Sequence, residues 1–181
     1  MSRPLLNLVL VVLVAVVSSF CHPSRAQEAG WSAAGFRVGI DDGANDEDFE
    51  QCEGFVRYDL PWSWSAASDW SLGTWIELNA GVLDGGGETA FVGSIGPGIN
   101  LKTFDERLAV WGGINATWIS EDTFGDEDLG GAFQFTSHIG ISFILTRPLS
   151  IGYRFQHMSN AGIYSKNPGL NLHMLEIACH F

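Results

Sequence analysis

The sequence predicts an all-β fold, an eight-stranded antiparallel transmembrane β-barrel. Segments of strand length alternate between apolar and polar residues, and no apolar run after residue 26 is long enough for a membrane-spanning helix. Aromatic residues also gather near the segment ends, where a membrane barrel carries its interfacial girdle. These residues are Trp31, Trp62, Trp64, Trp70, Trp111 and Trp118.

Residues 1–26 have the features of a secretory signal peptide, so the barrel is predicted for residues 27–181. Arg3 is a short basic head, and LLNLVLVVLVAVVSSF is an apolar core of the expected kind. The cleavage site is the small-residue sequence SRA that ends at Ala26. Because no basic stop-transfer flank follows the apolar run, a single transmembrane anchor is the weaker interpretation.

The predicted strands each have one apolar face. In chain order they include residues 34–40, 56–62, 72–82, 91–101, 110–118, 133–145, 151–155 and 175–181. The clearest is FQFTSHIGISFIL, whose odd and even positions separate by polarity over about a dozen residues. The odd positions are Phe133, Phe135, Ile139, Ile141, Phe143 and Leu145, and the even ones are Gln134, Thr136, His138, Gly140 and Ser142.

Two all-β folds fit this alternation. A soluble sandwich would turn the apolar faces inward, whereas an outer-membrane barrel would turn them toward lipid. Long acidic connections at 41–50, 84–88, 121–130 and 160–170 alternate with connections at 61–69, 102–107 and 146–149, as in a membrane barrel. The chain also ends in Phe181 on an apolar face, which resembles the C-terminal aromatic signal of bacterial outer-membrane proteins. We therefore predict a multi-pass protein of the bacterial outer membrane, with the acidic loops outside.

Charged residues on the polar faces are expected to fill the barrel. With eight strands the interior is just wide enough for side chains, so a pore is not expected. The charges available for internal pairing are Arg37, Arg57, Arg154, Glu53, Asp59, Glu77 and Glu176. Cys52 and Cys179 are predicted near opposite ends of the barrel, too far apart for a disulfide. The net charge of −12 makes nucleic acid an unsuitable partner.

A His and a Ser complete the apolar stripe of the seventh strand, at the height of the lipid headgroups. A hydroxyl beside an imidazole is the minimum for a nucleophilic hydrolase, and His157 and Ser159 share one strand face. A loop centred near Ser165 would place Asn171 opposite Ser159. The same register places His173 opposite His157, and Glu176 opposite Arg154 in the interior.

The motif QHMSNAGIYSKNPGLN resembles the lipid A deacylase family (PagL type, acyloxyacyl hydrolases). The resemblance is strong over residues 151–181 and only architectural before them. It implies hydrolysis of the ester-linked 3-hydroxyacyl chain at position 3 of lipid A, from the outer leaflet, with neither a metal nor another cofactor. The implied partners are lipid A or lipopolysaccharide and the surrounding membrane lipids, and a homodimer stays open.

The resemblance also assigns roles to residues. His157 would be the general base, Ser159 the nucleophile, Asn160 and Gly162 the oxyanion hole, and Asn167 a brace for that loop. The family pattern has a Glu as its third triad member, and Asn171 occupies that position here. An amide can orient an imidazole, but it cannot stabilise the imidazolium by charge, and this change costs a serine protease about ten-thousand-fold in kcat.

Three functions are consistent with the sequence. The first is a lipid A deacylase whose triad contains Asn171. The second is the same barrel retained as an inactive or altered esterase that acts on other lipids. The third is a non-enzymatic small barrel of the structural or adhesion type, which acts through its acidic loops. Removal of the Ser159 hydroxyl discriminates them, because only a serine hydrolase depends on it.

Overall fold

The computed structural model describes residues 29–65, 71–103 and 107–181. The predicted signal peptide and Trp70 therefore lie outside the described residues. The barrel strands are β1 (Gly30–Asp41), β2 (Phe49–Asp59), β4 (Ser71–Gly85), β5 (Glu88–Thr103), β6 (Leu108–Ile119), β9 (Phe133–Thr146), β10 (Leu149–Ser159) and β11 (Leu170–His180). Three short strands, β3 (Trp64–Ser65), β7 (Thr123–Phe124) and β8 (Glu127–Asp128), lie in connections. Over this described part of the chain, no helix is long and apolar enough to cross a membrane.

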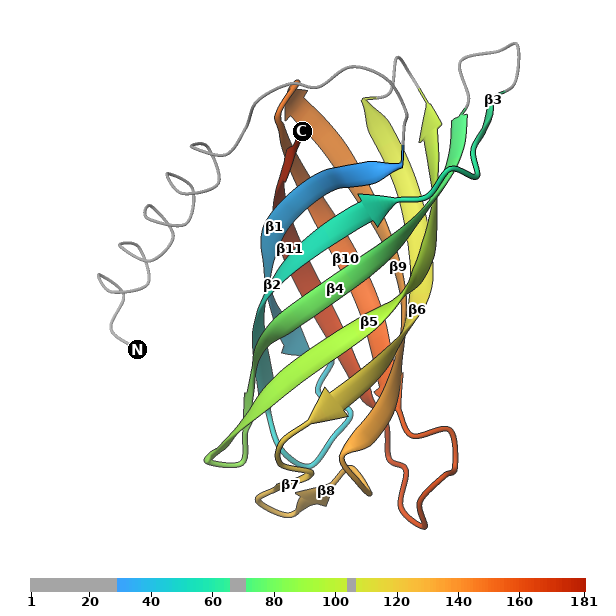
Figure 1. Ribbon diagram of the computed structural model, residues 1–181. Helices are drawn as coiled ribbons and strands as arrows, with labels where there is room; N and C mark the ends of the chain where they lie inside the picture. Colours follow the sequence, from blue (N-terminus) through green and yellow to red (C-terminus); the bar gives the residue numbers. More distant parts are fainter. Residues whose placement is uncertain (1–28, 66–70, 104–106) are drawn as a thin grey trace.

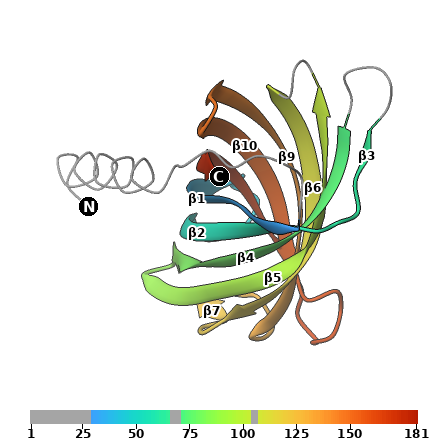
Figure 2. The ribbon, with the colours of Figure 1, turned by 45° about the horizontal axis from the view of Figure 1, so that its top comes forward.

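The eight long strands close into an antiparallel barrel, as predicted. Each pairs with its neighbours in chain order, and β1 closes the ring by pairing with β11. The wall is visible from the side in Figure 1 and obliquely, with the C-terminal end tilted forward, in Figure 2. In Figure 1 the C-terminus lies at the top, and the loops 42–48, 120–132 and 160–169 lie at the bottom. Closure pairs the edges that an open sheet would leave exposed.

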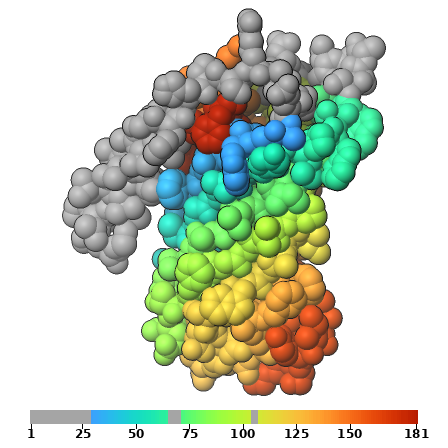
Figure 3. Space-filling view, viewed as in Figure 1, coloured from blue at the N-terminus to red at the C-terminus, as the bar shows by residue number. Residues whose placement is uncertain are grey.

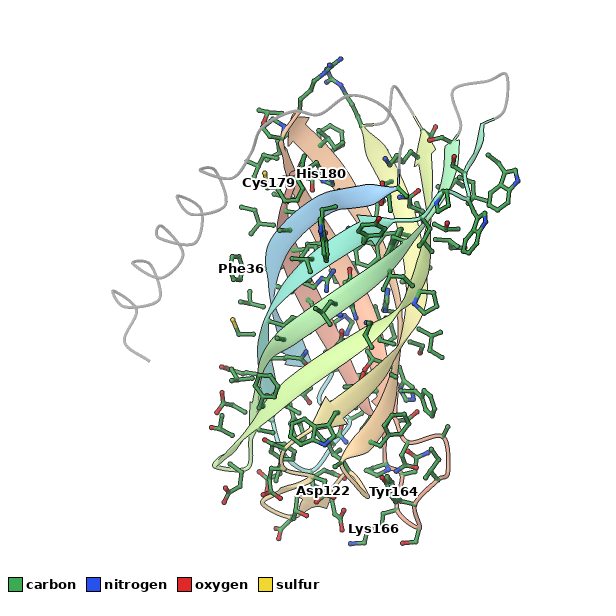
Figure 4. The ribbon with its side chains drawn as sticks, in the orientation of Figure 1. Phe36, Asp122, Tyr164, Lys166, Cys179 and His180 are labelled. Carbon is green, nitrogen blue, oxygen red and sulfur yellow. The ribbon has the colours of Figure 1, made fainter. Side chains whose placement is uncertain are left out.

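The wall is apolar outside and polar inside, the arrangement of a transmembrane barrel. Ile139, Ile141 and Phe143 are exposed on β9, whereas the residues between them point inward. Figure 4 shows the ring of Phe36 projecting away from the wall. Trp31, Trp62, Trp64 and Trp118 are exposed, which agrees with the predicted girdle.

Trp111 is an exception, and its assignment to the girdle was wrong. Its indole is buried inside the barrel, where it packs edge-on against Trp75. Strand parity explains the difference, because Trp111 shares the inward face of β6 with Asn115 and Thr117. Gly140, its partner on β9, has no side chain and leaves room for the ring.

The middle of the barrel contains a network of three arginines and three glutamates. Arg37 is at its centre and donates hydrogen bonds to Glu53, Glu77 and Glu176 at 2.7–3.1 Å. Arg57 binds Glu77 and Glu176, and Arg154 binds Glu77 at 2.9 Å. These six residues were all among the predicted interior charges. Asp59 is the last residue of β2 and accepts a hydrogen bond from Ser32 instead.

Apolar side chains fill the interior on the loop side of this network. The cluster was not predicted, and its members come from strand ends and from the loop before β9. They are Phe49, Leu83, Ala90, Val92, Ile119, Phe124, Leu129, Met158, Leu170, Leu172 and Met174. Because Met158 lies between His157 and Ser159, and Leu170 and Leu172 flank Asn171, this packing fixes the strands on which the candidate residues stand.

The predicted register between β10 and β11 was wrong by two residues. His157 pairs with Asn171, Phe155 with His173 and Gly152 with Glu176. The physical reason is that β11 begins directly after Gly169, which centres the loop on Tyr164 instead of Ser165. A shift of two preserves which face each side chain takes.

The shift also removes the predicted pair of Arg154 with Glu176. Arg154 stands opposite Met174 and reaches across the interior to Glu77. Glu176 binds Arg37 and Arg57 instead. Cys52 is a free cysteine, in agreement with the prediction that it does not bridge to Cys179.

Candidate active site

A row of polar side chains crosses three adjacent strands on the outer face of the wall and continues just past the end of a fourth. Ser137 of β9 pairs with His157 of β10, and His157 pairs with Asn171 of β11. Asp42 follows the last residue of β1, one step beyond the pair of Asp41 with Leu172, so it continues the row. Paired residues of antiparallel strands point to the same face, so the register itself assembles this row at the loop end of the barrel.

Two hydrogen bonds connect three members of the row. The Nδ1–H of His157 donates to Asn171 Oδ1 at 2.8 Å, and Asn171 Nδ2 donates to Asp42 Oδ2 at 2.9 Å. An amide oxygen can only accept, so Nδ1 of the neutral imidazole must hold the proton. The Nε2 atom then presents a lone pair, which is the form that a general base requires.

Ser159 lies on the same outer face, two residues further along β10 from His157. It is half-buried, and its hydroxyl makes no hydrogen bond to any residue of the described ranges. The structure therefore brings His157 and Asn171 into direct contact and places Ser159 beside them on one face. In structures without substrate, the contact between nucleophile and base is often looser than in the reacting complex.

The loop after Ser159 is folded around the buried side chain of Asn160. Asn160 Nδ2 donates to the carbonyl oxygens of Lys166 at 2.7 Å and Leu129 at 3.1 Å. Its own N–H donates to Asn167 Oδ1 at 2.9 Å. The loops 160–169 and 120–132 are thereby joined, and Figure 3 shows their atoms packed together at that end.

The N–H groups predicted for the oxyanion hole already have acceptors. The Gly162 N–H donates to Asn160 Oδ1 at 3.0 Å, and the Asn160 N–H is bound to Asn167. Between them, the N–H of Ala161 has no acceptor among the residues that the structure describes. Ala161 has φ 53°, a left-handed conformation that is uncommon for residues other than glycine and that often marks a functional turn.

A salt bridge closes the outer surface of the same loop. Lys166 Nζ lies 2.8 Å from Asp128 Oδ2. The hydrogen bond from Lys166, with a second from the Gly130 N–H, lowers the pKa of Asp128, and the same bond raises the pKa of Lys166. Figure 4 shows Lys166 and Tyr164 at the loop end of the barrel, together with Asp122.

Gly169 lies close to the imidazole on the loop side, a placement that sequence reasoning missed. Its φ is +77°, and a Cβ atom built on it would lie 2.8 Å from His157 Cε1. Asn45 Nδ2 donates to its carbonyl at 2.9 Å, which ties it to the loop after β1. The signal in the sequence was the glycine of the NPG segment, since a left-handed position in close contact with a ring accepts no side chain.

A polar cavity of about 280 Å³ opens beside His157. Its walls come from three loops and include His157 and Asn171. They are Ala44, Asn45, Asp46, Glu127, His157, Pro168, Gly169 and Asn171. Within the described ranges no group of three or more His, Cys, Asp or Glu side chains could hold a metal ion.

Asp42 is another site residue that the sequence did not reveal. Asp42 belongs to an acidic block that reads as a solvated loop, and only the three-dimensional register places it next to Asn171. Ser137 of β9, the paired neighbour of His157, also interrupts an apolar stripe, but its hydroxyl makes no hydrogen bond among the described residues.

A closed barrel with an apolar exterior defines the class of transmembrane β-barrels, and this barrel carries a paired imidazole and a hydroxyl on its lipid-facing wall. The comparisons with known proteins specify it further. A family model described as lipid A 3-O-deacylase (PagL) matches residues 51–180, and the chain belongs to this family.

Individual relatives agree with this membership. The lipid A deacylase PagL of Bordetella bronchiseptica is 46% identical over 76 residues, which span 42% of this chain and 43% of that protein. The enzyme of the same name from Pseudomonas aeruginosa is 28% identical over 180 residues, which span 92% and 93% of the two chains.

Solved structures support the fold. A crystal structure of the outer membrane enzyme PagL superimposes with a TM-score of 0.70 at 21% identity, covering 81% of this chain and 97% of that one. A designed transmembrane β-barrel gives a TM-score of 0.54 at 14% identity, covering 87% and 100%. At these identities the likeness concerns the barrel alone.

Proposed function

We propose that this chain is an outer-membrane esterase that removes the ester-linked 3-hydroxyacyl chain at position 3 of lipid A, with Ser159 as the nucleophile. The observation that carries the proposal is the 2.8 Å hydrogen bond from His157 to Asn171 on the lipid-facing wall. Membership in the deacylase family supplies the reaction class. A substrate anchored in the outer leaflet approaches this wall from the side, at the height where the apolar stripe ends.

The reaction proceeds in two halves, as in other serine hydrolases. His157 Nε2 takes the proton of Ser159 while Oγ attacks the ester carbonyl carbon. The sugar oxygen leaves when the tetrahedral intermediate collapses, and it takes that proton from the imidazolium. A water molecule, activated by the same nitrogen, then hydrolyses the acyl-serine and releases the hydroxy fatty acid. Asn171 holds the ring throughout.

The turn after Ser159 supplies the donors for the oxyanion in this proposal. The resemblance assigns them to Asn160 and Gly162, whose N–H groups have acceptors within the loop. The N–H of Ala161 is the uncommitted donor between them, and we add it to this set. Aimed backbone donors stabilise a tetrahedral intermediate by several kcal/mol, about 2.7–4 for one donor.

Mass spectrometry of lipid A tests the proposal directly. Cells that express the wild-type protein should lose the 3-hydroxyacyl chain at position 3, and cells that express Ser159→Ala should retain it. Heat-modifiable gel mobility verifies that each barrel is folded. Unmodified lipid A in wild-type cells that contain folded barrel would instead support the non-enzymatic alternative.

Ser137→Ala is the matched control, because Ser137 is the paired neighbour of His157 on the other side. It removes an exposed hydroxyl from the same face of the wall. Deacylation should survive this change. If Ser137→Ala abolishes activity and Ser159→Ala does not, the nucleophile has been assigned to the wrong serine.

A further inference from the structure

We infer that Asp42 is a positioning residue for this site: it fixes the orientation of the Asn171 amide and, through it, the proton on Nδ1 of His157. The inference rests on the proposed function for its effect on hydrolysis. Two hydrogen bonds carry it: His157 to Asn171 at 2.8 Å and Asn171 to Asp42 at 2.9 Å.

An asparagine amide can face a histidine with either its oxygen or its nitrogen, whereas a carboxylate presents an acceptor oxygen in both orientations. With its oxygen toward the ring, the amide accepts from Nδ1–H and leaves Nε2 as the base. With its nitrogen toward the ring, it donates to Nδ1, so Nε2 carries the proton and cannot take one from a serine. The two orientations have nearly the same shape, so packing alone does not choose between them.

Asp42 selects one of the two orientations of the Asn171 amide. An ionised carboxylate accepts hydrogen bonds and donates none, so the amide nitrogen of Asn171 must face it. The amide oxygen is then left for His157. Reversing the amide would place two acceptors, Asn171 Oδ1 and Asp42 Oδ2, against each other and would lose a charge-assisted hydrogen bond.

The loop after β1 holds Asp42 in place for this role. Asp42 Oδ1 accepts the N–H of Ala44 at 3.2 Å, so both carboxylate oxygens are bound. The preceding Asp41 accepts the N–H groups of Gly43 at 2.9 Å and Phe49 at 3.2 Å. The same loop is joined to the loop before β11 by the hydrogen bond from Asn45 to the Gly169 carbonyl. A carboxylate held by its own turn is preorganised and needs no rearrangement when substrate binds.

A kinetic cycle separates this role from a purely structural one. Asp42→Ala should lower kcat for lipid A deacylation by about 10- to 100-fold, the range seen when the partner that orients a ligand histidine is lost. In an Asn171→Glu background the same change should cost nothing, because a carboxylate accepts from Nδ1–H in either orientation. Equal losses in both backgrounds would mean that Asp42 only supports its loop.

Asp48→Ala is the matched control for this cycle. It removes the same charge from the same loop, and the exposed Asp48 side chain makes no hydrogen bond or ion pair within the described residues. It should keep wild-type kcat. A loss as large as that of Asp42→Ala would show that the charge of the loop matters, and not the bond to Asn171.

A second measurement does not depend on activity. Imidazole ¹⁵N chemical shifts of the barrel in detergent micelles, assigned with a His157→Gln variant, report which nitrogen carries the proton. Neutral His157 should be the Nδ1–H form in the wild type and should gain the Nε2–H form in Asp42→Ala. An unchanged tautomer would refute the inference. Serine-independent deacylation, seen with Ser159→Ala, would refute only the proposed function and leave the tautomer result standing.

Discussion

Two hydrogen-bonded networks of charged and polar side chains exist in this barrel. They differ in whether protein or the membrane exterior surrounds them. The interior network of Arg37, Glu77 and their partners is buried on all sides, and its three positive and three negative charges balance. The rim series from His157 through Asn171 to Asp42 lies on the outer wall and ends at Nε2 of His157, which has no hydrogen-bond partner among the described residues. Both use carboxylates as acceptors, yet only the second can meet a substrate.

The comparison indicates that burial decides whether such a hydrogen-bonded network stabilises the fold or can take part in a reaction. Inside the barrel every charge depends on its partner, because an unpaired buried ion costs several kcal/mol. At the rim, partial exposure lowers that dependence and leaves Nε2 of His157 available. We therefore expect the interior network to determine stability and the rim residues to determine activity, and single substitutions should separate the two.

The largest expected effect is at Asn171, on the rim. Asn171→Ala removes the acceptor of Nδ1–H and should lower deacylation by up to about 10⁴-fold, the loss seen when a triad histidine has the wrong tautomer. Asn171→Glu should preserve or raise activity, because a carboxylate also stabilises the imidazolium. Lipid A mass spectrometry over time measures both rates. Full activity of Asn171→Ala would mean that His157 and Ser159 work as a pair.

The next effect is in the interior and should appear as stability. Glu77→Ala leaves Arg37, Arg57 and Arg154 without their shared acceptor and should cost about 3–5 kcal/mol in unfolding free energy. Urea unfolding in lipid vesicles, followed by gel mobility, measures it. Glu88→Ala, an exposed charge at the first residue of β5, is the control and should cost little. If Glu77→Ala were as stable as wild type, the network would not be the structural element described above.

A smaller effect on activity is expected at Gly169. The added methyl group of Gly169→Ala would push the His157 ring away, and a displacement near 1 Å can cost about 100-fold in rate. Gly87→Ala is the matched control, since Gly87 also has a positive φ, +86°, but nothing within 4 Å of the added atom. Equal losses in the two variants would point to backbone strain instead of contact with the ring.

The smallest effect is expected at the salt bridge of Lys166 with Asp128. Lys166 is 64% exposed, so solvent screens the pair and Lys166→Ala should leave deacylation unchanged. The lowered pKa of Asp128 gives a stabilisation that is present above its unfolded pKa and lost as pH falls. The raised pKa of Lys166 gives one that is lost only as pH rises. Melting curves at neutral and acid pH measure this, and a large loss at neutral pH would contradict it.

Much of the barrel follows from the sequence because a strand has a period of two. Alternation assigned the faces of β9, and parity alone would have placed Trp111 inside. The same parity placed His157 and Ser159 outside even though the predicted register was wrong by two residues. Local pattern thus identifies which side of the wall a residue takes, but it does not give its height relative to the next strand.

The sequence by itself determined the fold class, the inward charges, and His157, Ser159 and Asn171 as the candidate residues. The tertiary structure decided which of them meet. The pairing of His157 with Asn171 depends on how the ten residues between β10 and β11 fold around Asn160, and the contact of Asn171 with Asp42 depends on barrel closure between β11 and β1. Both are contacts between residues distant in sequence, and no periodicity within a single strand encodes them.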